Sequence, residues 1–131
     1  MVIDTSALLA VLFDETDADR LIDAIASDRI RHVGAPTLVE AAAVLISRKG
    51  SQGTVILDAL LQRLSIEVVP MSADAAAFAR GAYAHWGKGV GSPGVLNFGD
   101  CLSYGVAMAE GGALLFKGDD FTKTDVPSAV Y

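Results

Sequence analysis

Several residue types are scarce in this 131-residue chain, which holds one cysteine, four prolines and fewer basic than acidic residues, 10 against 16. The lone cysteine, Cys101, cannot form a disulfide within the chain, and this fits a reducing compartment. We expect it to be a small buried core residue rather than a reactive thiol. The formal net charge of −6 argues against a protein that coats nucleic acid through a basic surface, although a local basic rim is compatible with it.

Long apolar runs are also missing. No apolar stretch reaches the roughly 18 residues that a membrane-spanning helix needs, and the N-terminus lacks the basic segment of a signal peptide. We therefore expect a cytoplasmic protein with no membrane partner. With 52% hydrophobic residues the chain can bury a real core, so we expect one domain over residues 1–131. The apolar excess also favours a partner, or a second copy of the chain, that covers part of the surface.

Short apolar segments alternate with helical patterns along the chain. Strands are expected at Val2–Ile3, Ile30–Val33, Ile66–Val69 and Ala113–Phe116. The spacing of apolar residues predicts helices at 6–13, 17–27, 36–49, 54–64, 72–85 and 100–109, with Thr16 as the N-cap of the second. The glycine-rich stretch 87–94 predicts a mobile loop. This alternation predicts an α/β sandwich around a mainly parallel sheet.

Acidic residues lie close to the ends of these strands. Asp4 directly follows the first strand, and the pair Asp119 and Asp120 follows the last one. Glu40 and Asp100 are expected in the first turns of helices that face the same edge. Ligands of parallel α/β sheets gather at the carboxyl ends of the strands. Several ionised carboxylates in one pocket repel each other, so their convergence would call for a cation such as Mg²⁺ or Mn²⁺, which takes oxygen ligands.

Each acid taken singly also has a structural explanation. Thr37 and Glu40 have the spacing of a helix capping box, and Asp100 suits a helix N-terminus through the helix dipole. For these two acids the structural and functional interpretations weigh equally. The Asp119–Asp120 pair fits a solvated turn. Asp4 is the hardest to explain in this way, because a carboxylate between a buried strand and an apolar helix has no cationic neighbour in the sequence.

Four stretches, in order along nearly the whole chain, resemble the motifs of PIN-domain ribonucleases and, more narrowly, of VapC toxins from type II (VapBC) toxin–antitoxin systems. These stretches are VIDTSALL at 2–9, LVEAAAVL at 38–45, LNFGDCLSYGVA at 96–107 and LLFKGDDF at 114–121. The resemblance implies an α/β/α sandwich with an acidic pocket for one or two Mg²⁺ or Mn²⁺ ions. It also implies an endoribonuclease acting on transfer or ribosomal RNA, and a homodimer neutralised by a VapB-like antitoxin, with a larger toxin–antitoxin assembly as a further state.

The resemblance assigns roles to residues by position. Asp4, Glu40 and Asp100 match the metal-binding acids of the family, and either Asp119 or Asp120 matches the fourth, with Asp120 favoured. A bound divalent ion lowers the pKa of its water, directs that water at a phosphodiester and offsets the charge that develops on the phosphoryl oxygens. Ser6, in the first motif, matches a small hydroxyl residue of the family that would orient Asp4 or a water on the metal. Ser6 suits a helix N-cap equally well.

Other residues are candidates for contacts with RNA. Lys117, Lys88 and Arg48 lie near the acidic motifs or the glycine-rich loop, and each would serve for phosphate contact. Trp86 and Tyr83 precede the loop and would stack on an unpaired base, although core packing is the simpler expectation.

Two other functions stay open. A phosphatase of the haloacid-dehalogenase kind also has an aspartate after its first strand, but it needs a second acid two residues later, where this chain has Ser6. A non-catalytic PIN-like binding module is the other alternative, and the retained acids argue against it. The histidines, His32 and His85, are far from the acidic motifs in sequence, so we expect surface or packing roles for both.

Overall fold

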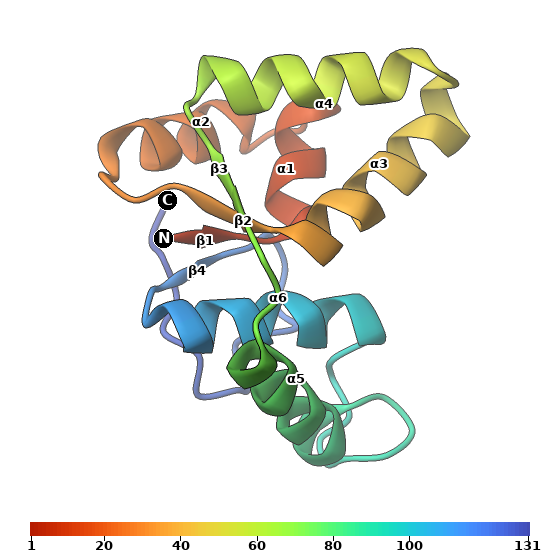
Figure 1. The fold of residues 1–131 in the computed structure, drawn as a ribbon, viewed down its shortest axis with the longest axis vertical. Helices are drawn as coiled ribbons and strands as arrows, with labels where there is room; N and C mark the ends of the chain where they lie inside the picture. Colours follow the sequence, from red (N-terminus) through yellow and green to blue (C-terminus); the bar gives the residue numbers. More distant parts are fainter.

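Four short parallel strands form the centre of the computed structural model, which describes residues 1–131 (Figure 1). The strands are β1 (Val2–Ile3), β2 (His32–Gly34), β3 (Glu67–Val69) and β4 (Leu114–Leu115). Their order in the sheet is β3-β2-β1-β4. The chain therefore adds strands on one side of β1 first and then crosses to the other side, and such switch points are where α/β sheets bind ligands.

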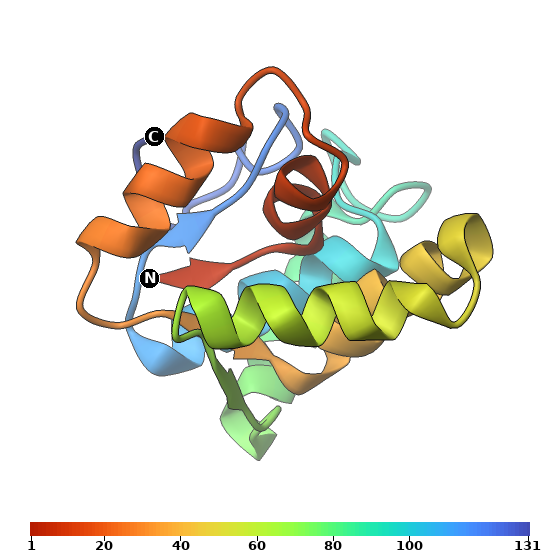
Figure 2. The ribbon, with the colours of Figure 1, turned by 90° about the horizontal axis from the view of Figure 1, so that it is seen from above.

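Six helices cover the two faces of the sheet (Figures 1 and 2). One face carries α1 (Thr5–Leu12), α2 (Ala18–Ser27), α3 (Ala35–Lys49) and α4 (Gln52–Arg63). The other face carries α5 (Ala73–Trp86) and α6 (Phe98–Glu110). None of the helices combines the length and the apolar character that crossing a membrane requires. The expected α/β/α sandwich with a parallel sheet is confirmed.

Alternating strand residues divide the core into two clusters. Ile3 and Leu115 belong to the cluster under α1–α4, whereas Val2 and Leu114 belong to the cluster around α6. Neighbouring side chains of a strand point to opposite faces, which explains why these pairs separate. The same alternation, continued through the extended backbone of Asp4, directs that carboxylate to the α6 side.

Three predictions about helix starts were wrong, for local reasons. The expected helix at 100–109 begins earlier, at Phe98, because Asn97 and Asp100 form a capping box. Thr16 is not the N-cap of α2; Asp17 occupies that position and makes no side-chain capping bond. Helix α1 begins at Thr5 because Asp4 is its N-cap, so the N-cap interpretation of Ser6 is also wrong.

The predicted capping box between Thr37 and Glu40 does not form. Helix α3 begins at Ala35, with Pro36 in its first turn, so Glu40 falls in the second turn rather than the first. Thr37 is fully buried, and its hydroxyl lies 3.0 Å from the hydroxyl of Ser103 on α6. The glutamate is therefore not needed to begin the helix.

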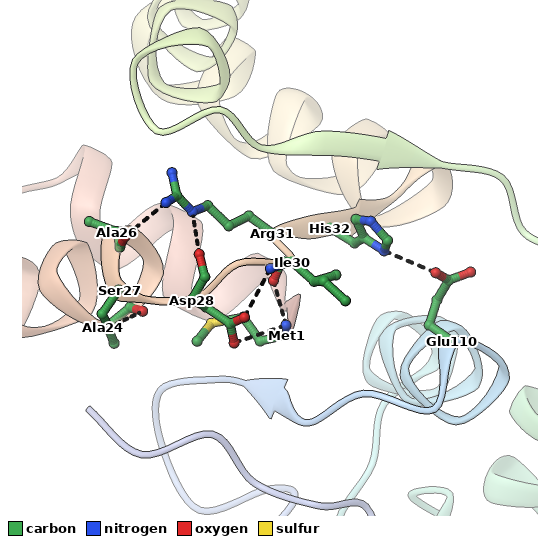
Figure 3. Close-up of polar contacts among 9 residues, drawn as sticks. All are labelled: Met1, Ala24, Ala26, Ser27, Asp28, Ile30, Arg31, His32 and Glu110. Carbon is green, nitrogen blue, oxygen red and sulfur yellow. Dashed lines mark hydrogen bonds and ion pairs between the residues drawn. The ribbon is translucent and has the colours of Figure 1, made fainter.

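The amino edge of the sheet holds paired charges (Figure 3). The Met1 ammonium group lies 3.1 Å from Asp28 Oδ2 and also donates to the carbonyl of Ile30. His32 Nδ1 lies 2.9 Å from Glu110 Oε2, at the end of α6. The pKa of Asp28 is lowered, first by the N–H of Ile30 that donates to its carboxylate and then by the nearby ammonium group. These contacts fix the beginning of β1 beside β2, and His32 lies in them at the amino edge, away from the acidic motifs.

Candidate active site at the carboxyl edge of the sheet

Asp4 is a buried carboxylate at the carboxyl end of β1. Its residue is only 3% exposed, and Oδ2 accepts hydrogen bonds from the backbone N–H of Ser6 at 2.9 Å and from its hydroxyl at 2.6 Å. Oδ1 accepts no hydrogen bond from the protein, yet it is not sealed from solvent, since no fully buried side-chain oxygen lacks a partner. One oxygen of Asp4 is therefore held and the other is free to bind a ligand.

Ser6 joins Asp4 to the end of β4. Its hydroxyl oxygen accepts a hydrogen bond of 3.0 Å from the backbone N–H of Lys117. Because that contact uses the oxygen as an acceptor, the hydroxyl proton is directed at Asp4 Oδ2. The arrangement fixes the orientation of the Asp4 side chain from two neighbouring strands.

Glu40 approaches the start of α6 across a glycine. Its Oε2 accepts a hydrogen bond of 2.9 Å from the Thr5 hydroxyl. A Cβ atom added at Gly99 would overlap both carboxylate oxygens of Glu40, so the absence of a side chain at Gly99 lets the glutamate lie against the first turn of α6. Burial raises the pKa of Glu40, the hydrogen bond from Thr5 opposes that rise, and the charge of Asp4 adds to it.

Among the acids at this edge, Asp100 has the most strongly shifted pKa. It lies in the first turn of α6, half-buried, and its Oδ2 accepts a hydrogen bond of 2.7 Å from the N–H of Asn97. Burial raises its pKa to about 6; the hydrogen bond from Asn97 lowers it, and the charges of Asp4 and Asp120 raise it further. Lys88 opposes the rise and is the one cation that acts on this carboxylate.

The final acidic pair divides into two different environments. Asp119 and Asp120 are both exposed, in the turn that follows β4. Asp120 raises the pKa of Asp100, and its Oδ2 lies 3.7 Å from Lys88 Nζ. The carbonyl of Asp119 instead accepts hydrogen bonds within the turn. Of the two candidates for the fourth acid, Asp120 is thus the one that acts on Asp100.

The acids interact in pairs rather than as one closed cage. The charge of Asp4 raises the pKa of Glu40 and of Asp100, and the charge of Asp120 raises the pKa of Asp100. No three acidic, histidine or cysteine side chains come close enough to surround a single ion. The donors are all oxygens, and Mg²⁺ commonly uses only one or two carboxylates and keeps several waters. The arrangement therefore fits such a hydrated cation and does not fit a fully protein-ligated one.

Two of the three predicted phosphate contacts have other partners in the structure. Lys117 Nζ lies 2.6 Å from Glu15 Oε2 and 3.5 Å from Asp17 Oδ2, in the connection between α1 and α2. The Arg48 guanidinium group lies 4.7 Å from the centre of the Phe13 ring. Lys88 is left as the basic side chain beside the acidic edge.

One exposed aromatic residue next to the site was missed in the sequence. Phe98, in the first turn of α6, is 71% exposed, and the helix expected at 100–109 did not include it. Its position two residues before Asp100 was the available signal. Trp86 packs against Tyr104 with ring centres 5.6 Å apart, as the simpler expectation had it. Cys101 is buried, and burial raises its pKa to about 11, so the prediction of a core cysteine is confirmed.

Comparisons with known proteins match nearly the whole chain to the PIN domain and to VapC ribonucleases. The family model of the PIN domain matches residues 1–127. Ribonuclease VapC30 of Mycobacterium tuberculosis is 48% identical over 96% of this chain and 95% of its own. Ribonuclease VapC of Mycolicibacterium smegmatis is also 48% identical, over 96% of this chain and 97% of its own.

Solved structures of low sequence identity share the fold. VapC20 of Mycobacterium tuberculosis, a toxin that cleaves the sarcin-ricin loop, aligns with a TM-score of 0.74 at 19% identity and 95% coverage of both chains. A chain of VapBC2 from Rickettsia felis, bound to a DNA fragment from its promoter, aligns with a TM-score of 0.71 at 18% identity, covering 97% of this chain and 94% of that one. These matches set aside the phosphatase alternative. The chain belongs to the PIN domain family and, within it, to the VapC ribonucleases.

Proposed function

We propose that the acids at the carboxyl edge hold a divalent cation, Mg²⁺ or Mn²⁺, with which this toxin-type ribonuclease cleaves phosphodiester bonds of RNA. The observation that carries the proposal is the buried Asp4 carboxylate, which has one anchored oxygen, one free oxygen and two acidic neighbours but no cationic partner. Such a group is unfavourable in a folded protein unless a cation joins it.

Asp4 and Asp100 are the residues that would hold the cation directly. Glu40 and Asp120 would add negative charge from either side, with Asp119 the weaker candidate for the fourth acid. A bound Mg²⁺ or Mn²⁺ supplies a water of lowered pKa and offsets the charge that develops on the phosphate.

The chain's own residues contribute orientation. Ser6 prevents the Asp4 carboxylate from rotating, because it holds Oδ2 through both its N–H and its hydroxyl. Asn97 holds Asp100 and Thr5 holds Glu40 in the same way, each through one hydrogen bond. The free oxygens are thus kept in place before a cation or RNA arrives, which is the condition for efficient catalysis.

The direct test is cleavage of total RNA by the purified protein with Mg²⁺, with Mn²⁺ and with EDTA. Asp4→Asn and Asp100→Asn keep the shape of the side chains and remove the charge, and we expect each to reduce cleavage by roughly 100-fold. Asp58→Asn, on the exposed side of α4, is the matched control and should cleave like the wild type. Unchanged cleavage in the two active-site variants would remove these acids from the mechanism.

The partners we propose are a structured RNA substrate, such as a loop of transfer or ribosomal RNA, and a small VapB-like antitoxin acting in the cytoplasm. Relatives named as ribonucleases and the similar fold of the VapBC2 chain support these partners. A homodimer is also proposed, on the basis of exposed apolar side chains such as Ile46 on α3 and Val55 on α4. Light scattering of the purified chain would contradict the dimer if it found only monomers at micromolar concentration.

A further inference from the structure

Phe98 stands between two apolar grooves beside the acidic edge. The larger groove, of about 660 Å³, lies between α5, the 87–94 loop and the start of α6. The smaller groove, of about 480 Å³, lies between α3 and α6 and is lined in part by Glu40 and Gly99. Phe98 and Leu102 line both. The apolar surface around Phe98 is therefore continuous with the candidate active site.

Basic side chains flank this surface on the side of α5 and the loop. Arg80 lines the larger groove. Lys88 extends from the loop towards Asp120, and it also acts on Asp100. These cations fit a polyanion. A second copy of a chain with a net charge of −6 would instead bring negative charge towards an edge that is already acidic.

We propose that Phe98 stacks on an unpaired base of the RNA and so places the neighbouring phosphodiester at the acids. This proposal rests on the proposed RNA cleavage and names a residue that binds the RNA substrate. An aromatic ring that is 71% exposed offers a face to any base, and the grooves on its two sides offer apolar walls. Phe98 and Asp100 share the first turn of α6, so one helix start presents both the base contact and the acid.

The test compares three substitutions at this position. Phe98→Ala removes the side chain, Phe98→Leu keeps an apolar group without a ring, and Phe98→Tyr keeps the ring. Phe78→Ala is the matched control, since Phe78 is 41% exposed on α5 and lines neither groove. Binding is measured by fluorescence anisotropy with labelled single-stranded oligo(A) and oligo(U) in EDTA, and cleavage is measured on the RNA that the wild type cuts.

We expect Phe98→Ala and Phe98→Leu to weaken oligonucleotide binding about tenfold, whereas Phe98→Tyr and Phe78→Ala bind like the wild type. The KM for cleavage should rise by a similar factor with little change in kcat, because stacking acts on the bound substrate and on the transition state alike.

Two results would overturn the inference. One is wild-type binding by Phe98→Leu, which would leave no role for the ring. The other is a change from dimer to monomer in Phe98→Ala with unchanged oligonucleotide binding, which would assign this surface to a contact between copies of the chain. Failure of the wild type to cleave RNA with either metal would count against the proposed function instead, and the binding comparison in EDTA would still decide the role of Phe98.

Discussion

An aspartate at each edge of the sheet has a shifted pKa, and the two shifts have opposite directions. Asp28, at the amino edge, receives a hydrogen bond from Ile30 and faces the Met1 ammonium group, and its pKa is lowered (Figure 3). Asp100, at the carboxyl edge, is half-buried near Asp4 and Asp120, and its pKa is raised to about 6. The amino edge satisfies its charges within the protein. The carboxyl edge leaves its carboxylates for something outside the protein to satisfy.

Basic residues reinforce this contrast. At the amino edge Arg31 donates 2.8 Å hydrogen bonds to the carbonyls of Ala26, Asp28 and Leu64. At the carboxyl edge, by comparison, Lys117 pairs with Glu15 and Asp17, and Lys88 forms its one ion pair with the exposed Asp120. The repulsion left among the carboxylates lowers stability, so a cation that binds there should stabilise the folded state.

The largest effect short of removing an acid is expected from Ser6→Ala, which breaks the 2.6 Å hydrogen bond that fixes Asp4. We expect a loss of cleavage activity of about tenfold, because a ligand that loses its supporting partner no longer keeps its orientation. Steady-state cleavage kinetics with Mg²⁺ measure it. Ser47→Ala, exposed near the end of α3, serves as the control and should retain full activity. Equal activity of the two variants would show that Asp4 needs no support.

The two edges should differ in how their aspartates make the stability of the protein depend on pH. The folded-state pKa of Asp100 lies above its unfolded value, so the protein loses stability from this group as the pH rises from about 4 to about 6. Asp100→Asn should therefore raise the Tm of the metal-free protein at pH 7 and change it little at pH 4. Asn keeps the oxygen that accepts from Asn97, so the capping bond survives.

Asp28→Asn should act with the opposite sign. The lowered pKa of Asp28 contributes stability above its unfolded value, and that stability is lost as the pH falls through the folded value. The variant should therefore lower the Tm at pH 7 and lose this effect in acid. Thermal unfolding of both variants from about pH 2 to pH 7 measures the pair, because the Asp28 contribution is lost only below its lowered pKa. Shifts of the same sign at neutral pH would contradict the contrast between the edges.

The smallest effect is expected for Lys88→Met, which removes a 3.7 Å ion pair between two half-exposed side chains. The free energy of unfolding should change by less than about 0.5 kcal/mol, because exposed pairs contribute little. The pKa of Asp100 should rise, since Lys88 is the cation that lowers it. Denaturant unfolding and an NMR titration of the Asp100 carboxyl carbon measure the two effects.

Much of the fold was predictable because the spacing of apolar residues within each segment indicates whether it forms a strand or a helix. The strands and helices follow from apolar spacing, and Asp4 stood out because no cation is near it in sequence. The site was harder to predict where long-range packing decides. Helix α3 begins at Ala35, so Glu40 falls in its second turn, and Glu15, far away in the chain, pairs with Lys117. The exposure of Phe98 could not be predicted either, because it depends on how α6 packs against α3 and α5.

We propose that the carboxyl edge binds a divalent cation through Asp4 and Asp100, whereas the amino edge binds none. The most direct measurement is the change in Tm on adding Mn²⁺ at pH 7 to the wild type, Asp100→Asn and Asp28→Asn. Binding to the folded state alone raises the Tm. We predict a rise for the wild type and for Asp28→Asn and none for Asp100→Asn. An equal rise in all three proteins, or none in the wild type, would show that Asp100 does not hold the cation.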